Sequence, residues 1–165
     1  MQKSFRGLAA LVFGVMALAA LPLWAQKPKS EKEAQAQAVA AAKLLAEADD
    51  LYGSRDLLRA GETYRKVLDL PAENPAHARA YYGLARIAAL NDDPEQAKKL
   101  FQKTLDSSPG EDTKSWAYLY LGRLADMAGE REQAVRNFRA VLQIGGAPEQ
   151  VKNAAQKKLD QLLKR

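Results

Sequence analysis

The sequence predicts an all-α protein built from three stacked helix pairs. Five sets of residues recur along the chain at a constant spacing of 37 residues, which indicates an internal repeat. Proline, glycine and capping residues divide the chain into segments of helical length. No segment has the apolar–polar alternation or the turn residues of a β-hairpin. A helix-turn-helix unit present in three copies accounts for all of these observations.

Residues 1–25 have the pattern of a secretory signal peptide. Lys3 and Arg6 come first, an apolar run over 7–21 follows, and Ala25 is a small residue at the expected cleavage site. The run is shorter than the roughly 20 residues that a membrane-spanning helix needs. We therefore expect an exported protein, periplasmic or secreted, without stable membrane insertion after cleavage. An uncleaved N-terminal membrane anchor is the alternative.

The composition narrows the range of functions. The 165 residues are 47% apolar and 27% charged, as in an ordinary globular domain. The absence of cysteine excludes disulfides, thiolate metal sites and a cysteine nucleophile, and the single histidine, His77, is expected on the surface. No phosphate-binding loop or hydrolase motif is present. We therefore expect a protein that is not an enzyme and that has no cofactor and no bound metal.

The charges give no indication of a nucleic-acid partner. The net charge is +5, but basic and acidic residues are interspersed, and no basic stripe with aromatic residues is present. The acidic pairs Asp92-Asp93 and Glu111-Asp112 fall at expected helix starts, where carboxylates cap the backbone and complement the helix dipole. Capping is therefore a better interpretation of these pairs than acid–base catalysis.

The first helix pair is expected to begin after the leader. Ser30 and Glu33 form a capping box, and a polar, alanine-rich helical extension over 26–40 leads into a helix that ends near Gly53-Ser54. A second helix follows that break. The extension could also be a coiled-coil or oligomerisation arm, but its apolar heptads are not sustained, which favours a simple extension of the first helix.

The middle pair has clear boundaries. Asn74 as cap and Pro75 as first helical residue start one helix. Asp93 and Pro94 start the next helix in the same way, and Pro109-Gly110 ends it. This pattern predicts two helices joined by a short turn.

Glycines mark the last pair. Gly129 separates its two helices, and Gly145-Gly146 ends the second of them. Pro148 opens a final helix with apolar residues on one face, namely Ala155, Leu159 and Leu162. Because the last pair would otherwise expose its packing face, this segment is expected to be a capping helix.

The repeated positions have distinct expected roles. Small residues let paired helices approach closely, and large residues fill the wider spaces between pairs. The small residues are Ala48, Ala85 and Gly122 on the first helices and Ala60, Ala97 and Ala134 on the second helices. The large residues are Leu44, Tyr81 and Tyr118, then Tyr64, Phe101 and Phe138, then Leu68, Leu105 and Leu142.

These positions resemble the pattern of the tetratricopeptide repeat family. The middle copy has Tyr81, Leu84-Ala85, Ala97, Phe101 and Pro109; the last copy has Tyr118, Leu121-Gly122, Ala134 and Phe138. The first copy departs from the pattern at Glu47, where leucine is usual. The family repeat has 34 residues and this one has 37, and we place the extra residues in the loops that join the pairs.

The resemblance, to a bacterial secreted or periplasmic type of the family, implies a right-handed α-solenoid. Its three repeats are expected over 41–146, at about 41–77, 78–114 and 115–146, with a capping helix over 147–165. The family usually binds an extended peptide or a partner helix in the concave groove that the first helices line. The residues expected in this groove are Leu45, Asp49, Tyr52, Arg79, Tyr82, Arg86, Trp116, Leu119, Arg123 and Met127.

Two arginines suggest the chemistry of a ligand. Arg86 and Arg123 lie one repeat apart and are expected to be neighbours in the groove, with aromatic side chains close by. Arginine and aromatic residues are enriched where binding energy is concentrated, and guanidinium groups bind carboxylates well. An acidic segment of a partner is therefore expected there. Alternatively, Asp49 and Asp126 neutralise the two arginines in surface ion pairs.

Together these features predict a non-catalytic scaffold that binds a peptide or a partner protein. One alternative is a structural subunit, either of an envelope or secretion complex or of a homo-oligomer. Another is an accessory to an envelope enzyme.

Overall fold

The computed structural model describes residues 31–71 and 74–164, which form helices and their connections and contain no strand. The helices of these residues are α1 (Glu31–Gly53), α2 (Leu57–Asp69), α3 (Asn74–Leu90), α4 (Pro94–Asp106), α5 (Glu111–Met127), α6 (Arg131–Leu142) and α7 (Glu149–Leu163). The expected signal peptide, the start of the extension and the Ser30 cap lie outside the described residues.

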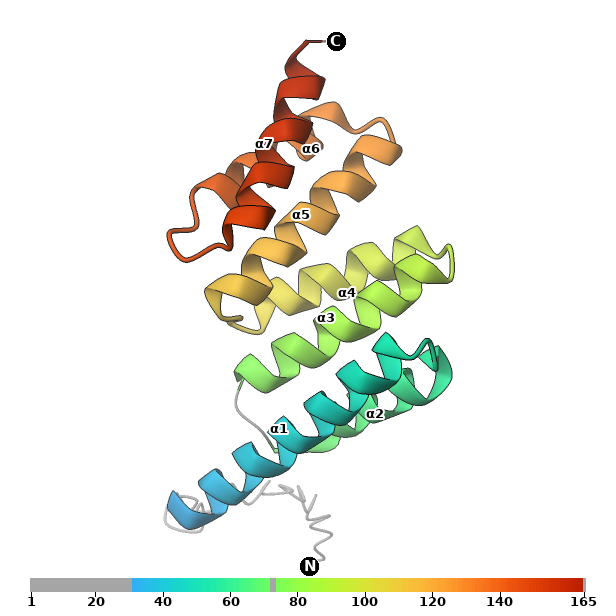
Figure 1. The fold of residues 1–165 in the computed structure, drawn as a ribbon, viewed down its shortest axis with the longest axis vertical. Coiled ribbons are helices and arrows are strands. Elements are labelled where there is room, and N and C mark those ends of the chain that lie inside the picture. Colours follow the sequence, from blue (N-terminus) through green and yellow to red (C-terminus); the bar gives the residue numbers. More distant parts are fainter. Residues whose placement is uncertain (1–30, 72–73, 165) are drawn as a thin grey trace, which may run out of the picture.

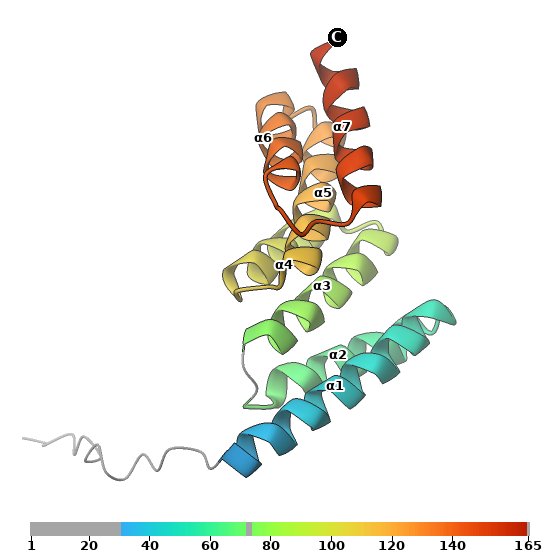
Figure 2. The ribbon, with the colours of Figure 1, turned by 60° about the vertical axis from the view of Figure 1, so that its left-hand side comes forward.

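The helices pack as three pairs that stack in chain order (Figure 1). The pairs are α1 with α2, α3 with α4, and α5 with α6, and α7 packs against α6 and α5. Each first helix also contacts the first helix of the next pair. Figure 2 shows that the pairs are rotated relative to one another, so the stack twists. The fold is an all-α solenoid, as the repeat predicted.

The turn within each pair has the same backbone geometry. Arg55, Asp92 and Gly129, at equivalent positions, all have positive φ, of 68°, 58° and 75°. In the first two turns the next residue is an aspartate, Asp56 or Asp93, whose carboxylate accepts a hydrogen bond from the backbone N–H three residues later, at 3.2 and 3.0 Å. The expected cap at Asp93 and the tight turn at Gly129 are therefore confirmed.

The repeated positions form the core. Three of the five sets are buried throughout: Ala48, Ala85 and Gly122; Ala60, Ala97 and Ala134; and Tyr64, Phe101 and Phe138. The two remaining sets, which begin with Leu44 and Leu68, are half-buried at the edges of the core. The large rings thus fill the spaces between pairs, as expected.

The extra length of the repeat does not lie in the loops, and that prediction was wrong. Few residues separate the pairs, since α3 begins at Asn74 after α2 ends at Asp69, and α5 begins at Glu111 after α4 ends at Asp106. By contrast, α3 and α5 each have 17 residues and α2 and α4 have 13. α5 begins at Glu111, as expected from the Glu111-Asp112 pair, whose carboxylates stabilise its first turn. α3 begins at Asn74, one residue earlier than expected. Longer first helices widen the surface that they line.

The last helix, α7, covers the end of the stack. Val151, Ala155, Leu159 and Leu162 are at most 6% exposed and form a cluster with residues of α5 and α6. Because this face of α7 is buried against the third pair, α7 has the packing expected of a capping helix.

A candidate binding groove on the first helices

A hollow of about 520 Å³ lies across the first helices α1, α3 and α5. Six of the residues expected in the groove line it, namely Asp49, Tyr52, Arg79, Tyr82, Arg86 and Trp116. Gly53, Asp112, Thr113 and Tyr120 complete the lining. The hollow therefore draws side chains from all three repeats, and we call it the inner groove.

One wall of the inner groove is a hydrogen-bonded chain that joins three helices. The phenol of Tyr64 donates to Asp49 Oδ1 at 2.6 Å, and Arg79 Nη2 donates to Asp49 Oδ2 at 2.9 Å. The Tyr64 ring fits because Gly83 lies against it, where a Cβ would overlap ring atoms. Burial raises the pKa of Tyr64 well above its usual range, and the hydrogen bond to Asp49 adds to the shift, so the phenol remains a donor.

Arg86 is held by aromatic rings rather than by a carboxylate. Its guanidinium carbon lies 3.8 Å from the ring centroid of Tyr52 and 5.5 Å from that of Tyr82, which are cation–π distances. Its Nε is buried and has no hydrogen-bond partner among the described residues. Burial lowers the pKa of Arg86, but the neighbouring tyrosines, Tyr82 foremost, together raise it by more, so the group keeps its charge. The result is a fixed cation with an unused donor.

An aromatic cluster supports the floor of the inner groove. The rings of Phe101 and Tyr120 are stacked, with centroids 5.1 Å apart and planes 9° apart. Tyr82 packs against both, at 6.0 and 6.2 Å, and Trp116 lies 6.2 Å from Tyr120. Burial raises the pKa of Tyr82 well above its usual range, with Tyr120 adding to the shift. These rings are fixed by the core and need little reordering to bind a ligand.

Two residues expected in the groove belong to the core instead. Leu45 is 3% exposed and Leu119 is fully buried. Leu119 clusters with α7 residues such as Val151, and Leu45 lies in the cluster that joins the first two pairs. Neither of them lines the inner groove. Tyr82, at the equivalent position of α3, reaches the groove because its ring is larger.

Arg123, which was expected beside Arg86 in the groove, does not line the inner groove. Arg123 lines a separate hollow of about 330 Å³ with Ala154 and Lys157 of α7. It lies 5.5 Å from the ring of Tyr120, which lines the inner groove. Arg86 and Arg123, at equivalent positions on α3 and α5, therefore line different hollows. Met127, 80% exposed at the end of α5, lines neither.

The expected ion pairs are not the ones that form. Asp49 pairs with Arg79, and Asp126 pairs with Lys158 at 3.4 Å. Within the described part of the chain, Arg86 has no carboxylate within the 4.0 Å limit of an ion pair. Arg86 and Asp49 therefore form no direct ion pair.

Sequence reasoning missed Tyr120 and the two residues of the first turn of α5, Asp112 and Thr113. A signal for Tyr120 was present, because the equivalent positions hold the small residues Ala46 and Gly83. A bulky ring in an otherwise small position suggests a local change in packing. The sequence gives no signal for Asp112 and Thr113 beyond their place at a helix start.

The described residues hold no group of histidine and carboxylate side chains suited to a metal ion. Over the same residues, no helix has both the length and the apolar character that a membrane crossing requires. His77 is half-buried, and its Nε2 lies 3.0 Å from the carbonyl oxygen of Leu70, so it contributes to the link between the first two pairs rather than to a site.

Comparison with known families identifies the repeat. Residues 76–145 match the model of the tetratricopeptide repeat family. This part of the chain is similar to tetratricopeptide repeats. The matched range covers almost all of α3 to α6, which are the two copies with the clearer family pattern. No curated protein matches the chain. Tetratricopeptide repeats generally mediate protein–protein interaction and are typically non-catalytic scaffolds.

Proposed function

We propose that the chain is a member of the tetratricopeptide repeat family and a non-catalytic scaffold that binds a peptide or a partner protein in the inner groove. The observation that carries the proposal is Arg86, whose buried Nε has no hydrogen-bond partner and whose guanidinium forms no ion pair among the described residues. A buried donor without a partner costs stability. A ligand that supplies an acceptor recovers that cost on binding.

The chemistry of the groove favours an acidic segment as the ligand. A carboxylate that reaches Arg86 gains charge-assisted hydrogen bonds, which are about twice as strong as neutral ones. Tyr52, Tyr82 and Trp116 offer rigid apolar surface beside it. Asp112, at the rim on α5, disfavours a second acidic group at that end. The preferred ligand therefore has one carboxylate flanked by apolar side chains.

We also propose that the protein is exported. The support is the order of a basic head, an apolar run and a small residue over 1–25. The intact mass of the protein isolated from its native cells should lack about these residues. A full-length chain in the membrane fraction would contradict cleavage and leave the anchored alternative.

Affinity capture from the native envelope fraction tests the binding function. Wild-type protein, Arg86→Glu and the control Arg139→Glu should be compared, because Arg139 is exposed on α6, outside the inner groove. We expect a protein that wild type and the control retain and that Arg86→Glu loses, with unchanged helical content. Equal retention by Arg86→Glu would move the site away from the inner groove.

The same preparation separates this proposal from a structural role. A scaffold for a separate partner should be a monomer at micromolar concentration once the partner is removed. A stable dimer that Arg86→Glu dissociates would instead show that the groove is occupied by a second copy.

A further inference from the structure

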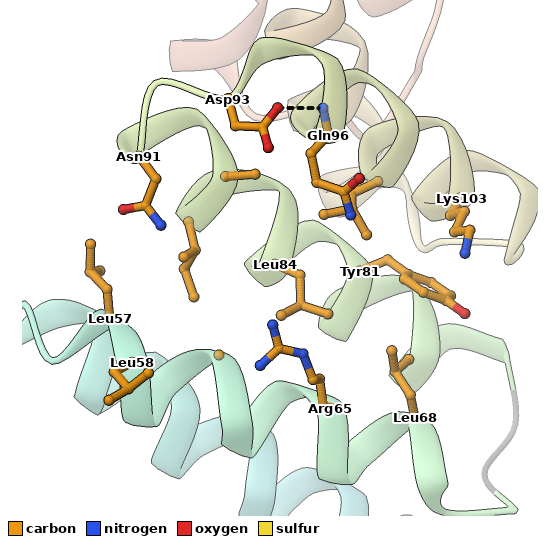
Figure 3. Close-up of a pocket in the computed structure, with 14 residues that line it drawn as sticks. Leu57, Leu58, Arg65, Leu68, Tyr81, Leu84, Asn91, Asp93, Gln96 and Lys103 are labelled. Atoms are coloured by element: carbon orange, nitrogen blue, oxygen red, sulfur yellow. Dashed lines mark hydrogen bonds between the residues drawn. The ribbon is translucent and has the colours of Figure 1, made fainter.

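The second helices leave a separate groove on the other side of α3. It has a volume of about 680 Å³ and lies between α2 and α4, with α3 as its floor (Figure 3). Among the described residues, α2 and α4 do not approach each other within 8 Å between Cα atoms. Tyr81 and Leu84 in this groove and Tyr82 and Arg86 in the inner groove lie on opposite faces of α3, given the helical repeat of 3.6 residues. We call it the outer groove.

The surface of the outer groove is largely apolar. Leu57, Leu58 and Leu68 come from α2, and Leu84 lies on the floor between them and α4 (Figure 3). Leu58 is 74% exposed, which is unusual for a leucine on a helix of the core. The wall of α2 has a gap at Gly61, which has no side chain to cover the floor.

The repeat provides an internal comparison, because an equivalent groove lies between α4 and α6 over α5. That second groove measures about 200 Å³. Lys98 stands at the position equivalent to Gly61, and its Nζ bonds Glu130, which is equivalent to Asp93, at 3.1 Å. This ion pair spans the groove. The groove between α2 and α4 lacks it and stays open.

The same comparison shows a change in charge and polarity. Arg65 and Lys103 line the outer groove, whereas the equivalent residues are Gln102 and Ala140. Neither cation has a carboxylate partner among the described ion pairs, and Lys103 lies 5.4 Å from the ring centroid of Tyr81. In Figure 3, Arg65 extends toward Leu84. A large, mainly apolar groove with two unpaired cations thus occurs where the other copy has a smaller, more polar one that is bridged by an ion pair.

We propose that the outer groove binds an amphipathic helix of a partner protein that carries an acidic side chain opposite Arg65 and Lys103. The walls and floor are helices whose backbone groups are already bonded, so the groove offers no edge to an extended strand. A segment buried there must satisfy its own backbone hydrogen bonds, as a helix does. The cations select an acidic residue at the end of the groove near Leu68.

The charges argue against two other occupants. The chain's own N-terminal segment carries Lys3 and Arg6 and would bring basic groups to a basic groove. A second copy would have to present an acidic, apolar helix face, and the exposed faces of the described helices carry mixed charges. A separate acidic partner helix fits both the apolar surface and the cations.

A display library of amphipathic peptides of about 16 residues, or four helical turns, tests the proposal. The library varies acidic and basic residues beside a fixed apolar face, and the full chain is the target. The variant Gly61→Lys introduces into the outer groove a lysine equivalent to Lys98, which bridges the groove between α4 and α6. A Cβ at Gly61 meets only ordinary contacts, 3.7 Å to Arg65 and 3.8 Å to Ile87, so this variant should fold.

We expect enriched peptides to carry an acidic residue and to bind Gly61→Lys about tenfold more weakly or worse, the loss typical of a blocked central contact. The double variant Arg65→Glu with Lys103→Glu should have a similar effect, and Lys99→Glu, on the exposed surface of α4, should have none. Arg86→Glu should leave this binding unchanged, which separates it from binding in the inner groove. Melting temperatures establish that each variant is folded.

Several results would overturn the proposal. Enriched peptides that bind Gly61→Lys as well as wild type, or that are basic, would contradict it. Peptide binding that appears only after residues 1–30 are removed would assign the groove to the chain's own N-terminal segment. A dimer that Gly61→Lys abolishes would assign it to a second copy. A library from which no peptide is enriched would leave the groove without a helical ligand and refute the proposal.

Discussion

Replacing Gly122 by alanine should destabilise the protein, whereas replacing Gly61 by alanine should stabilise it. Both glycines lie inside helices, and neither has a positive φ. Both replacements therefore gain the intrinsic helix preference of alanine, about 1 kcal/mol. What differs is the space around the new methyl group.

The structure determines whether each replacement stabilises or destabilises the protein. A Cβ at Gly122 would lie 2.5 to 2.9 Å from three ring atoms of Phe138, which is fully buried and cannot move away. Overpacking of this kind costs about 1–3 kcal/mol, which exceeds the gain in helix preference and leaves a net loss of about 1 kcal/mol. At Gly61 the nearest atoms are 3.7 and 3.8 Å away, so the gain of about 0.5–1 kcal/mol remains.

Urea unfolding followed by circular dichroism measures both effects. The two variants should differ by about 2 kcal/mol, or roughly 5–8 °C in melting temperature for a domain of this size. The matched pair controls for helix preference, since both replace glycine by alanine within a helix. A Gly122→Ala variant at least as stable as wild type would refute the close packing of Phe138 against α5.

Three further predictions concern the core and its titration. Phe101→Ala should cost about 3–5 kcal/mol and more than Tyr64→Ala, because Phe101 lies in the middle copy with packed neighbours on both sides; an unchanged melting temperature would contradict the stacking. Leu119→Ala should lower the free energy of unfolding by about 2–5 kcal/mol and Met127→Ala by at most about 0.5 kcal/mol, as measured by denaturant titration. Equal effects would refute the burial of Leu119 and the exposure of Met127. The folded pKa values of Tyr64 and Tyr82 are raised above the unfolded value of 10.0, so the unfolded state loses these protons first and stability should fall as pH rises above about 10. Tyr64→Phe should flatten that fall, and a slope equal to that of wild type would show that Tyr64 is not buried as described.

The sequence was sufficient for the fold because the signal was repeated. Positions such as Ala97 and Phe101 recur at 37 residues in three copies, and a helical period fixes which of them face the core. Capping residues such as Asp93 and turn glycines such as Gly129 act within a few residues, so the sequence predicts them directly. The length of the first helices was harder to predict from the sequence, because a helix start can extend by a turn at little cost.

The groove was predicted less well because it depends on contacts between repeats. Leu45, Tyr82 and Leu119 occupy equivalent positions on the three first helices. Only the size of each side chain and the rotation between pairs decide which of them reach the groove. The partner of Asp49 is Arg79 rather than Arg86, a choice set by the position of α3 relative to α1. Such long-range geometry is not contained in the spacing of residues along one helix.

The most direct test of the account is to map where the captured partner binds. Hydrogen exchange of the full chain should be measured with and without a peptide of that partner. The account predicts slower exchange where the partner covers the inner groove, over residues 79–86 of α3 and 112–120 of α5, and no such change in Arg86→Glu. Protection confined to α6 and α7, or protection of α3 and α5 that persists in Arg86→Glu, would contradict the claim that Arg86 and the inner groove bind the partner.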